Sequence, residues 1–195
     1  MLTLLSIVQA LALELLWSYV HESKMLFEPS WGALLTWIQV ATNFLGIIVI
    51  WIVYAGTAMR FRWVPTTSDS VYPFVVGALE FVLIEILAPE HMGLWFLCLG
   101  VIFGLMTWVT YMQMRRARLD SENEVFFSRV EPATLKDFYP AIAIVCGAFL
   151  AGIYLQVSGD RGIVALIAAL LALAVLVRQL ILTRSFWELS VADTE

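Results

Sequence analysis

The sequence predicts an all-α fold: a polytopic integral membrane protein built as a bundle of six transmembrane helices. Composition is one reason, since 62% of the 195 residues are hydrophobic and only 14% are charged, whereas soluble domains carry about 25% charged residues. A second reason is that the apolar residues form continuous runs long enough to cross a bilayer as helices. Strands of a membrane barrel would instead alternate apolar and polar residues. We therefore expect a single transmembrane domain over residues 1–195.

Short polar segments and prolines separate the six expected spans. The first apolar run has no positively charged start and is interrupted by Glu14, so we interpret it as a retained helix and not as a cleaved signal peptide. The segment Thr134-Leu-Lys-Asp137 matches a capping box, which predicts where the fifth helix begins. The predicted spans are residues 2–20, 34–59, 71–88, 92–114, 138–157 and 162–183.

Basic residues gather on one side of this predicted bundle, which is the third reason for the fold. If the six spans alternate in direction, only Lys24 and Arg161 lie on the side away from the termini. Because positively charged loops stay in the cytoplasm, we expect both termini and the long loop 115–137 to be cytoplasmic. The membrane would then be the inner (plasma) membrane of a bacterial-type cell. The basic residues on the cytoplasmic side are Arg60, Arg62, Arg115, Arg116, Arg118, Arg129, Lys136, Arg178 and Arg184.

Glu80 is the residue that says most about function, because it interrupts the apolar run of the third span. A carboxylate near the middle of a bilayer costs roughly 2.5–3.5 kcal/mol on insertion scales. Some interaction must offset that cost. One interpretation is a hydrogen-bonded cluster in which Glu80 is protonated and serves structure only. The other is a site for an ion, a proton or a polar ligand, open to the outside.

Four further polar residues are expected to share the outer half of the membrane with Glu80. At a rise of about 1.5 Å per residue, Glu14, Gln39, Asn43 and Glu85 all fall at this depth, whereas the inner half holds almost no polar residue. Gln39 and Asn43 lie one turn apart, and the stripe that contains Glu14 is expected to face them or a shared cavity. Glu85 lies close to the interface and cannot point at the same centre as Glu80.

Small residues predict where helices pack closely. Gly100 and Gly104 form a GxxxG pattern on the fourth span, and Gly147 continues a four-residue spacing of small side chains on the fifth. Packing within one protomer and contact between copies of the chain both fit this pattern. Trp95 is one of several Trp near span ends, where an aromatic belt is expected at the membrane interface.

No motif of an enzyme is present in the sequence: it has no P-loop, GxGxxG, HExxH or G-x-S-x-G segment. We expect no enzymatic activity, cofactor, metal site or nucleic-acid partner. The expected function is to bind or pass a small polar or cationic species through an outward-facing polar cavity. The alternative is a non-transporting subunit, a sensor, anchor or assembly partner that docks through loop 115–137 and the tail 184–195. Its surroundings would be the lipid bilayer and either further copies of the chain or another membrane protein.

Overall fold

The computed structural model describes residues 2–191, and side chains as far as Arg184. This part of the chain is all-helical, and six of its helices are long and apolar enough to cross a membrane. Short helical turns lie in the connections: Lys24–Phe27, Pro89–His91, Ser121–Asn123, α5 at Glu124–Phe127 and Leu135–Phe138. The long helices are α1 (Leu2–Glu22), α2 (Trp31–Arg60), α3 (Thr67–Glu85), α4 (Met92–Ala117), α6 (Tyr139–Ser158) and α7 (Ile163–Val191). The predicted all-helical fold with six long apolar helices is confirmed.

Capping residues explain where the helices begin. The Thr134–Asp137 capping box forms as predicted and opens the turn that leads into α6. A second capping box, between Thr66 and Asp69, starts α3 at Thr67, four residues before the predicted start. Ser30 caps α2 by accepting a hydrogen bond from the Ala33 amide (3.1 Å), so α2 also begins earlier than predicted. Each cap satisfies amide groups that the first turn of a helix leaves without partners.

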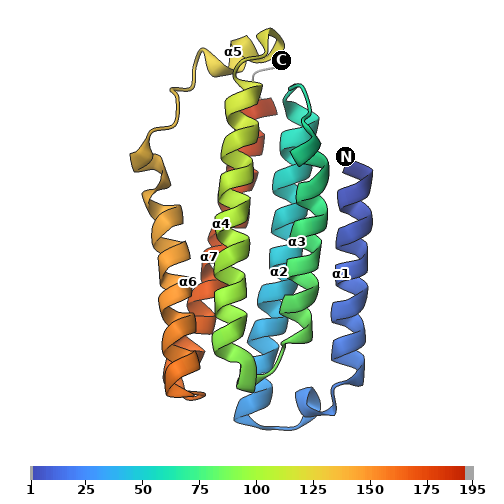
Figure 1. The fold of residues 1–195 in the computed structure, drawn as a ribbon, viewed down its shortest axis with the longest axis vertical. Coiled ribbons are helices and arrows are strands. Elements are labelled where there is room, and N and C mark those ends of the chain that lie inside the picture. The colour runs from blue at the N-terminus through green and yellow to red at the C-terminus, as the bar shows by residue number, and fades with distance from the viewer. Residues whose placement is uncertain (1, 192–195) are drawn as a thin grey trace.

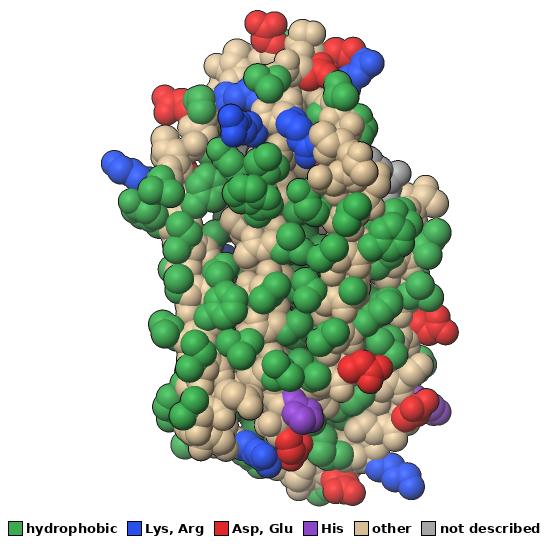
Figure 2. All heavy atoms as spheres, in the orientation of Figure 1, with side chains coloured by type: hydrophobic (Ala, Val, Ile, Leu, Met, Phe, Trp, Pro, Cys, Tyr) green, Lys and Arg blue, Asp and Glu red, His purple; other side chains and the backbone are tan. Residues whose placement is uncertain are grey.

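The six long helices run roughly parallel to one axis and alternate in direction (Figure 1). One end of the bundle holds the α2–α3 and α4–α6 connections, including α5; we call it the Arg-rich end. The opposite end holds the other three connections. On the face seen in Figure 2, a broad apolar band covers the middle, and most visible Lys and Arg side chains lie towards the Arg-rich end.

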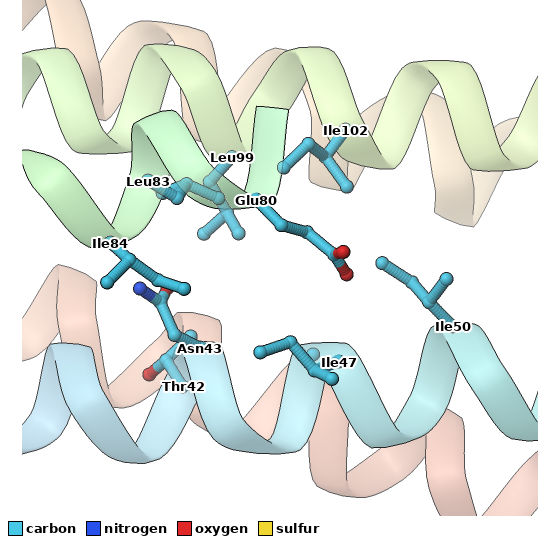
Figure 3. Close-up of a pocket in the computed structure, with 10 residues that line it drawn as sticks. Thr42, Asn43, Ile47, Ile50, Glu80, Leu83, Ile84, Leu99 and Ile102 are labelled. Atoms are coloured by element: carbon cyan, nitrogen blue, oxygen red, sulfur yellow. The ribbon is translucent and has the colours of Figure 1, made fainter. Parts of the chain in front are cut away.

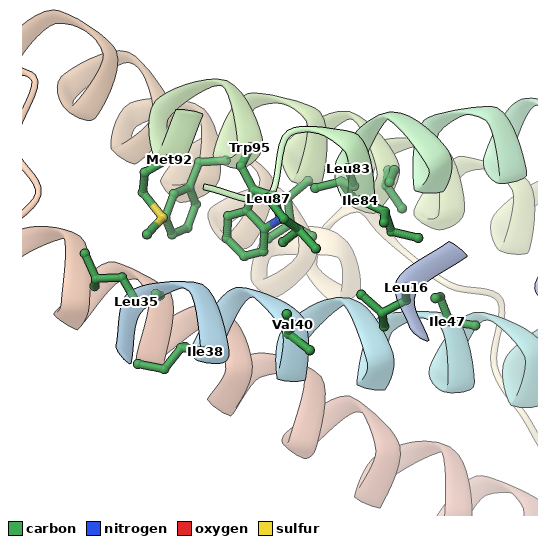
Figure 4. Close-up of a cluster of buried hydrophobic side chains, with 14 of the residues drawn as sticks. Leu16, Leu35, Ile38, Val40, Ile47, Leu83, Ile84, Leu87, Met92 and Trp95 are labelled. Atoms are coloured by element: carbon green, nitrogen blue, oxygen red, sulfur yellow. The ribbon is translucent and has the colours of Figure 1, made fainter. Parts of the chain in front are cut away.

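The core lies mainly among α1 to α4, and Leu155 of α6 and Ala165 and Ala169 of α7 join its edge. α1 packs against α2 and α3, and α3 packs against α4. Leu16 of α1, Leu35 and Ile47 of α2 and Ile84 of α3 all enter this cluster (Figure 4). α6 lies along α4 and α7 along α2, while α6 and α7 contact each other only sparsely. The bundle is therefore a four-helix core with two peripheral helices.

Glycines set the closest contacts between helices. A Cβ on Gly93 of α4 would lie 2.6 Å from the backbone nitrogen of Gln156 in α6, and one on Gly152 would lie 2.8 Å from Leu97. Gly100 also faces α6, where a Cβ would lie 3.3 Å from Phe149, whereas a Cβ on Gly104 would make an ordinary contact with Val145 at 3.9 Å. Close backbone approach of this kind is how small residues join helices in lipid.

Gly147 differs from the other glycines of the predicted packing pattern. It is exposed on α6, and a Cβ there would meet nothing within 4 Å. Gly147 therefore faces away from the rest of the protomer. The glycine that α6 uses against α4 is Gly152, which the predicted spacing does not include.

Candidate functional site

Glu80 lies inside the four-helix core with 4% of its surface exposed. The Gln9 side chain of α1 donates a hydrogen bond from Nε2 to Glu80 Oε2 at 2.8 Å. The second carboxyl oxygen, Oε1, is buried and has no hydrogen-bond partner among the described residues. The carboxyl group is thus held at one oxygen and left unpaired at the other.

The crossing of α1 and α3 explains why Gln9 reaches Glu80. One turn before Glu80, a Cβ on Gly77 would lie 2.1 Å from Val8 Cγ1, so only glycine admits α1 at this distance. Val8 directly precedes Gln9, and both are buried on the face of α1 that meets α3. The missing side chain of Gly77 therefore sets the position of the hydrogen-bond donor.

A cavity of about 30 Å³ lies beside Glu80. In Figure 3 the carboxyl group points along the bundle toward Ile50 and away from Asn43. This direction agrees with the rule that helical side chains lean toward the N-terminus of their helix, which for α3 is the Arg-rich end. Such a volume holds a water molecule or two, whereas binding sites for organic ligands measure about 300–1,000 Å³. The cavity is lined by Thr42, Asn43, Gly46, Ile47, Ile50, Glu80, Leu83, Ile84, Leu99 and Ile102.

Asn43 and Gln39 extend the polar interior toward the opposite end of the bundle. Trp95, which is fully buried, donates from its indole Nε1 to Asn43 Oδ1 at 3.2 Å. Asn43 Nδ2 and both amide atoms of Gln39 are buried without a partner in the described part of the chain. Buried polar groups are nearly always hydrogen-bonded, so this concentration of unpaired atoms marks the interior as unusual.

The place of Trp95 near the start of α4 suggested that it belongs to an aromatic belt. It does not, because it has no exposed surface. Its side chain turns into the core, where its ring also packs edge-on against Phe96 at 5.0 Å between centroids. Position along a helix predicts the depth of a Trp but not the direction in which it points.

Two of the five predicted site residues lie outside this cluster. Glu14 and Glu85 are exposed, and neither lines the cavity beside Glu80. The inward face of α1 carries Leu5, Val8, Gln9, Ala12 and Leu16, and this helical spacing leaves Glu14 on the outside. Gln9, which is not among the predicted site residues, is the residue of α1 that bonds to Glu80. The structure brings Glu80 and Asn43 together around one cavity, with Gln39 one turn further along α2.

A second buried polar cluster lies near the Arg-rich end. Asp69 has no exposed surface and accepts two hydrogen bonds from the Arg116 guanidinium, both at 2.6 Å. The backbone N–H and hydroxyl of Thr66 donate to the same carboxylate at 2.7 and 2.9 Å. This paired geometry joins the start of α3 to the end of α4. Arg116, one of the basic residues predicted on the cytoplasmic side, therefore also has a partner within the bundle.

Further polar side chains lie between these two clusters. The hydroxyl of Tyr54 and the Nε2 of Gln113 are buried and have no hydrogen-bond partner among the described residues. Tyr54 lies within electrostatic range of Asp69. The expectation that the inner half of the bundle is almost free of polar groups is therefore wrong. Buried polar side chains follow the core of α1–α4 from Gln39 to Asp69.

The connection between α4 and α6 is docked against the end of the bundle. Asn123 donates from Nδ2 to the Arg62 carbonyl at 2.6 Å and to the Ala117 carbonyl at 2.8 Å. The rings of Phe126 and Phe127 lie 5.0 and 5.4 Å from the Phe61 ring. Arg62 and Glu122 form an exposed ion pair, and the Arg62 guanidinium lowers the pKa of the Glu122 carboxyl below its ordinary value.

Among the described side chains, which end at Arg184, no three His, Cys, Asp or Glu form a group that could hold a metal ion. The site consists of the Glu80 carboxyl and the Asn43 amide at a water-sized cavity, with the amides of Gln9 and Gln39 buried nearby. No protein-family model, curated protein or solved structure matches this chain.

Proposed function

We propose that this chain is an integral membrane protein that binds and passes a small cationic species at Glu80, and that a proton is the species that fits best. Six helices would span the plasma membrane, with the Arg-rich end in the cytoplasm. The observation that carries the proposal is the Glu80 carboxyl, buried and unpaired at one oxygen beside a cavity of about 30 Å³. A cavity of this size admits water and not an organic substrate.

Buried polar groups on both sides of Glu80 support passage as well as binding. Asn43 and Gln39 lead toward the opposite end, which would face outward, and Tyr54 and Gln113 lead toward the Arg-rich end. Intramembrane carboxyl groups surrounded by such side chains are the usual elements of proton relays. A proton moving through bound water needs no wide channel, which agrees with the tight packing around the cavity.

The test is proton flux in liposomes that contain the purified protein and a trapped pH-sensitive dye. A potassium gradient with valinomycin sets the membrane potential that drives protons inward. The unaltered protein should acidify the lumen faster than empty liposomes do. Glu80→Gln, which keeps the shape and removes the titratable group, should reduce the flux at least tenfold. Glu85→Gln, the matched change at an exposed acid of the same helix, should leave the flux unchanged. Equal flux in protein-containing and empty liposomes would contradict the proposal.

The alternative function is that of a non-transporting subunit, and the docked α4–α6 connection is the observation that supports it. Its apolar residues Leu119, Val125 and Leu135 are 84%, 66% and 68% exposed although the segment is held in place by Asn123. A fixed segment with exposed apolar side chains suits recognition by another protein. A photo-crosslinker at Val125 in cells should then capture one defined membrane protein, and a crosslinker at exposed Leu150 of α6 should not.

A further inference from the structure

A large cleft opens between α2, α4 and α7 in the half of the bundle nearest the Arg-rich end. It measures about 910 Å³ and has predominantly apolar walls, including Trp51 of α2, Met114 of α4 and Ile181 of α7. The cleft exists because α6 and α7 join in a tight turn at the opposite end and then diverge (Figure 1). α7 follows α2 while α6 follows α4, so the surface of α4 between them is left uncovered.

Two arginines line this cleft toward the Arg-rich end. Arg60 is the last residue of α2, and Arg184 lies on α7. No Asp or Glu occurs among the described lining residues. The Nε atom of Arg60 is buried without a hydrogen-bond partner, and its guanidinium carbon lies 5.9 Å from the rings of Phe61 and Phe126. These rings orient the guanidinium but do not neutralise it. The cleft thus combines an apolar body with two guanidinium groups at its rim.

A second cleft serves as a comparison. It measures about 620 Å³, lies between α4 and α6, and includes Trp108, Tyr111 and Phe138 in its walls. No Lys or Arg is among its described lining residues. Both clefts can accept an apolar chain, but only the cleft with Arg60 and Arg184 has a reason to prefer a negatively charged molecule.

We propose that the cleft of α2, α4 and α7 is a binding site for one anionic glycerophospholipid. The acyl chains lie against Trp51, Met114 and Ile181, and the phosphate accepts hydrogen bonds from Arg60 and Arg184. Guanidinium groups match phosphate oxygens in geometry as well as charge. Basic pockets between membrane helices recognise acidic headgroups in this way. The proposal depends on the membrane placement above and not on the role of Glu80.

Fluorescence quenching by brominated lipids tests the proposal, because Trp51 lines this cleft and Trp108 lines the other. The protein is reconstituted in phosphatidylcholine vesicles that contain a small, varied fraction of brominated phosphatidylglycerol or brominated phosphatidylcholine. The emission of each reporter is obtained by difference from Trp51→Phe or Trp108→Phe. For Trp51, half-quenching should need at least tenfold less brominated phosphatidylglycerol than brominated phosphatidylcholine. For Trp108, the two lipids should quench equally.

Arg60→Gln and Arg184→Gln should each weaken the preference of Trp51 for phosphatidylglycerol roughly fivefold. Arg115→Gln, at an exposed arginine of α4 outside the cleft, should not change it. Thr110→Phe narrows the cleft without altering its charge, and it should reduce quenching of Trp51 by both lipids. Circular dichroism and gel filtration show whether each variant is folded, and Thr110→Phe remains informative if an arginine variant is not.

Equal quenching of Trp51 by the two lipids would mean that the cleft is filled by bulk lipid without preference, and it would overturn the proposal. Retention of the preference in the folded Arg60→Gln, Arg184→Gln double variant would also overturn it. So would protection of Trp51 from both lipids in the unaltered protein, since a second copy of the chain would then cover the cleft. None of these readouts depends on proton flux, so this proposal and the proposed function can fail separately.

Discussion

The four-helix core and the two peripheral helices, α6 and α7, differ in how deeply their residues are buried and in whether they hold buried polar side chains. In the apolar windows of α2 and α4, 50% of residues are buried, whereas only 17% are buried in those of α6 and α7. Every buried polar or charged side chain of the described spans lies on α1 to α4. Polar groups can be held in a membrane only where protein surrounds them. α6 and α7 each pack mainly along one neighbour, so protein does not surround the side chains on their other faces.

Along their length the peripheral helices are attached by close contact, whereas polar bonds hold the turn that joins them: Trp31 donates to the Arg161 carbonyl at 2.5 Å, and Arg161 pairs with Glu90 at 3.2 Å. Lipid tails are as apolar as the helices, so no hydrophobic force drives helix association within a bilayer. α6 meets α4 through Gly93 and Gly152, and α7 brings fully buried Ala165 and Ala169 into the core cluster. The comparison predicts that damage to the core and damage to the periphery have separable effects.

The largest effect is expected from breaking the ion pair that closes the core at the Arg-rich end. Arg116→Met leaves the buried Asp69 carboxylate without its charged partner and should reduce the free energy of unfolding by about 3–5 kcal/mol. The double variant Asp69→Asn, Arg116→Met should recover part of this loss, because no charge is left buried. Equilibrium unfolding in mixed micelles measures both. Arg115→Met, the neighbouring exposed arginine, should stay within about 0.5 kcal/mol of the unaltered protein.

The next effect concerns the attachment of α6. Gly152→Leu should cost about 1–3 kcal/mol, because the new side chain collides with Leu97 and with the backbone of α4. A disulfide between cysteines placed on facing positions of α4 and α6 should then form more slowly. Gly147→Leu introduces the same side chain on the same helix into open space and should leave the rate unchanged. If the folded Gly152→Leu variant also lost proton flux, core and periphery would not be separable.

Removal of the Gln9 side chain that donates to Glu80 should have a similar or smaller effect. Gln9→Leu takes away the hydrogen bond at 2.8 Å and leaves the Glu80 carboxyl without a protein partner, which costs roughly 1–3 kcal/mol. Gln179→Leu, at an exposed position of α7, should change the free energy of unfolding by less than about 0.5 kcal/mol. Equal effects of the two substitutions would mean that the polar interior contributes nothing special to stability.

The smallest expected effect lies outside the spans, at the Arg62–Glu122 pair. The pKa of Glu122 is lower in the folded protein than its ordinary value of about 4.3. Above about pH 4.3 the ionised Glu122 therefore makes its full contribution to docking of the α4–α6 connection. The contribution is lost as the pH falls through the lower, folded-state pKa. Amide hydrogen exchange around Asn123 should therefore rise slightly between pH 5 and pH 3, after correction for intrinsic exchange. Glu122→Gln should remove this pH dependence.

Much of the fold could be predicted from the sequence, because a long apolar run in a bilayer must form a helix to pair its own backbone hydrogen-bonding groups. Helix ends were less predictable, since Thr66 and Asp69 begin α3 inside a segment that hydropathy alone places outside the membrane. Glu80 could be found because a carboxyl group in an apolar run has few explanations. Its partner could not, because counting residues gives depth but not direction. Glu14 lies at a suitable depth and faces outward, whereas Gln9 lies deeper and faces α3.

The contact between Gly77 and Val8 links the position of an entire helix to one carboxyl group. At this point Val8 of α1 occupies the space that a side chain at position 77 of α3 would need. A shift of α1 along its axis by one turn, about 5.4 Å, would bring Leu5 or Leu13 to the place of Gln9. Glu80 would then face an apolar side chain and lose its donor. The axial position of the first helix therefore decides whether the Glu80 carboxyl has a hydrogen-bond donor.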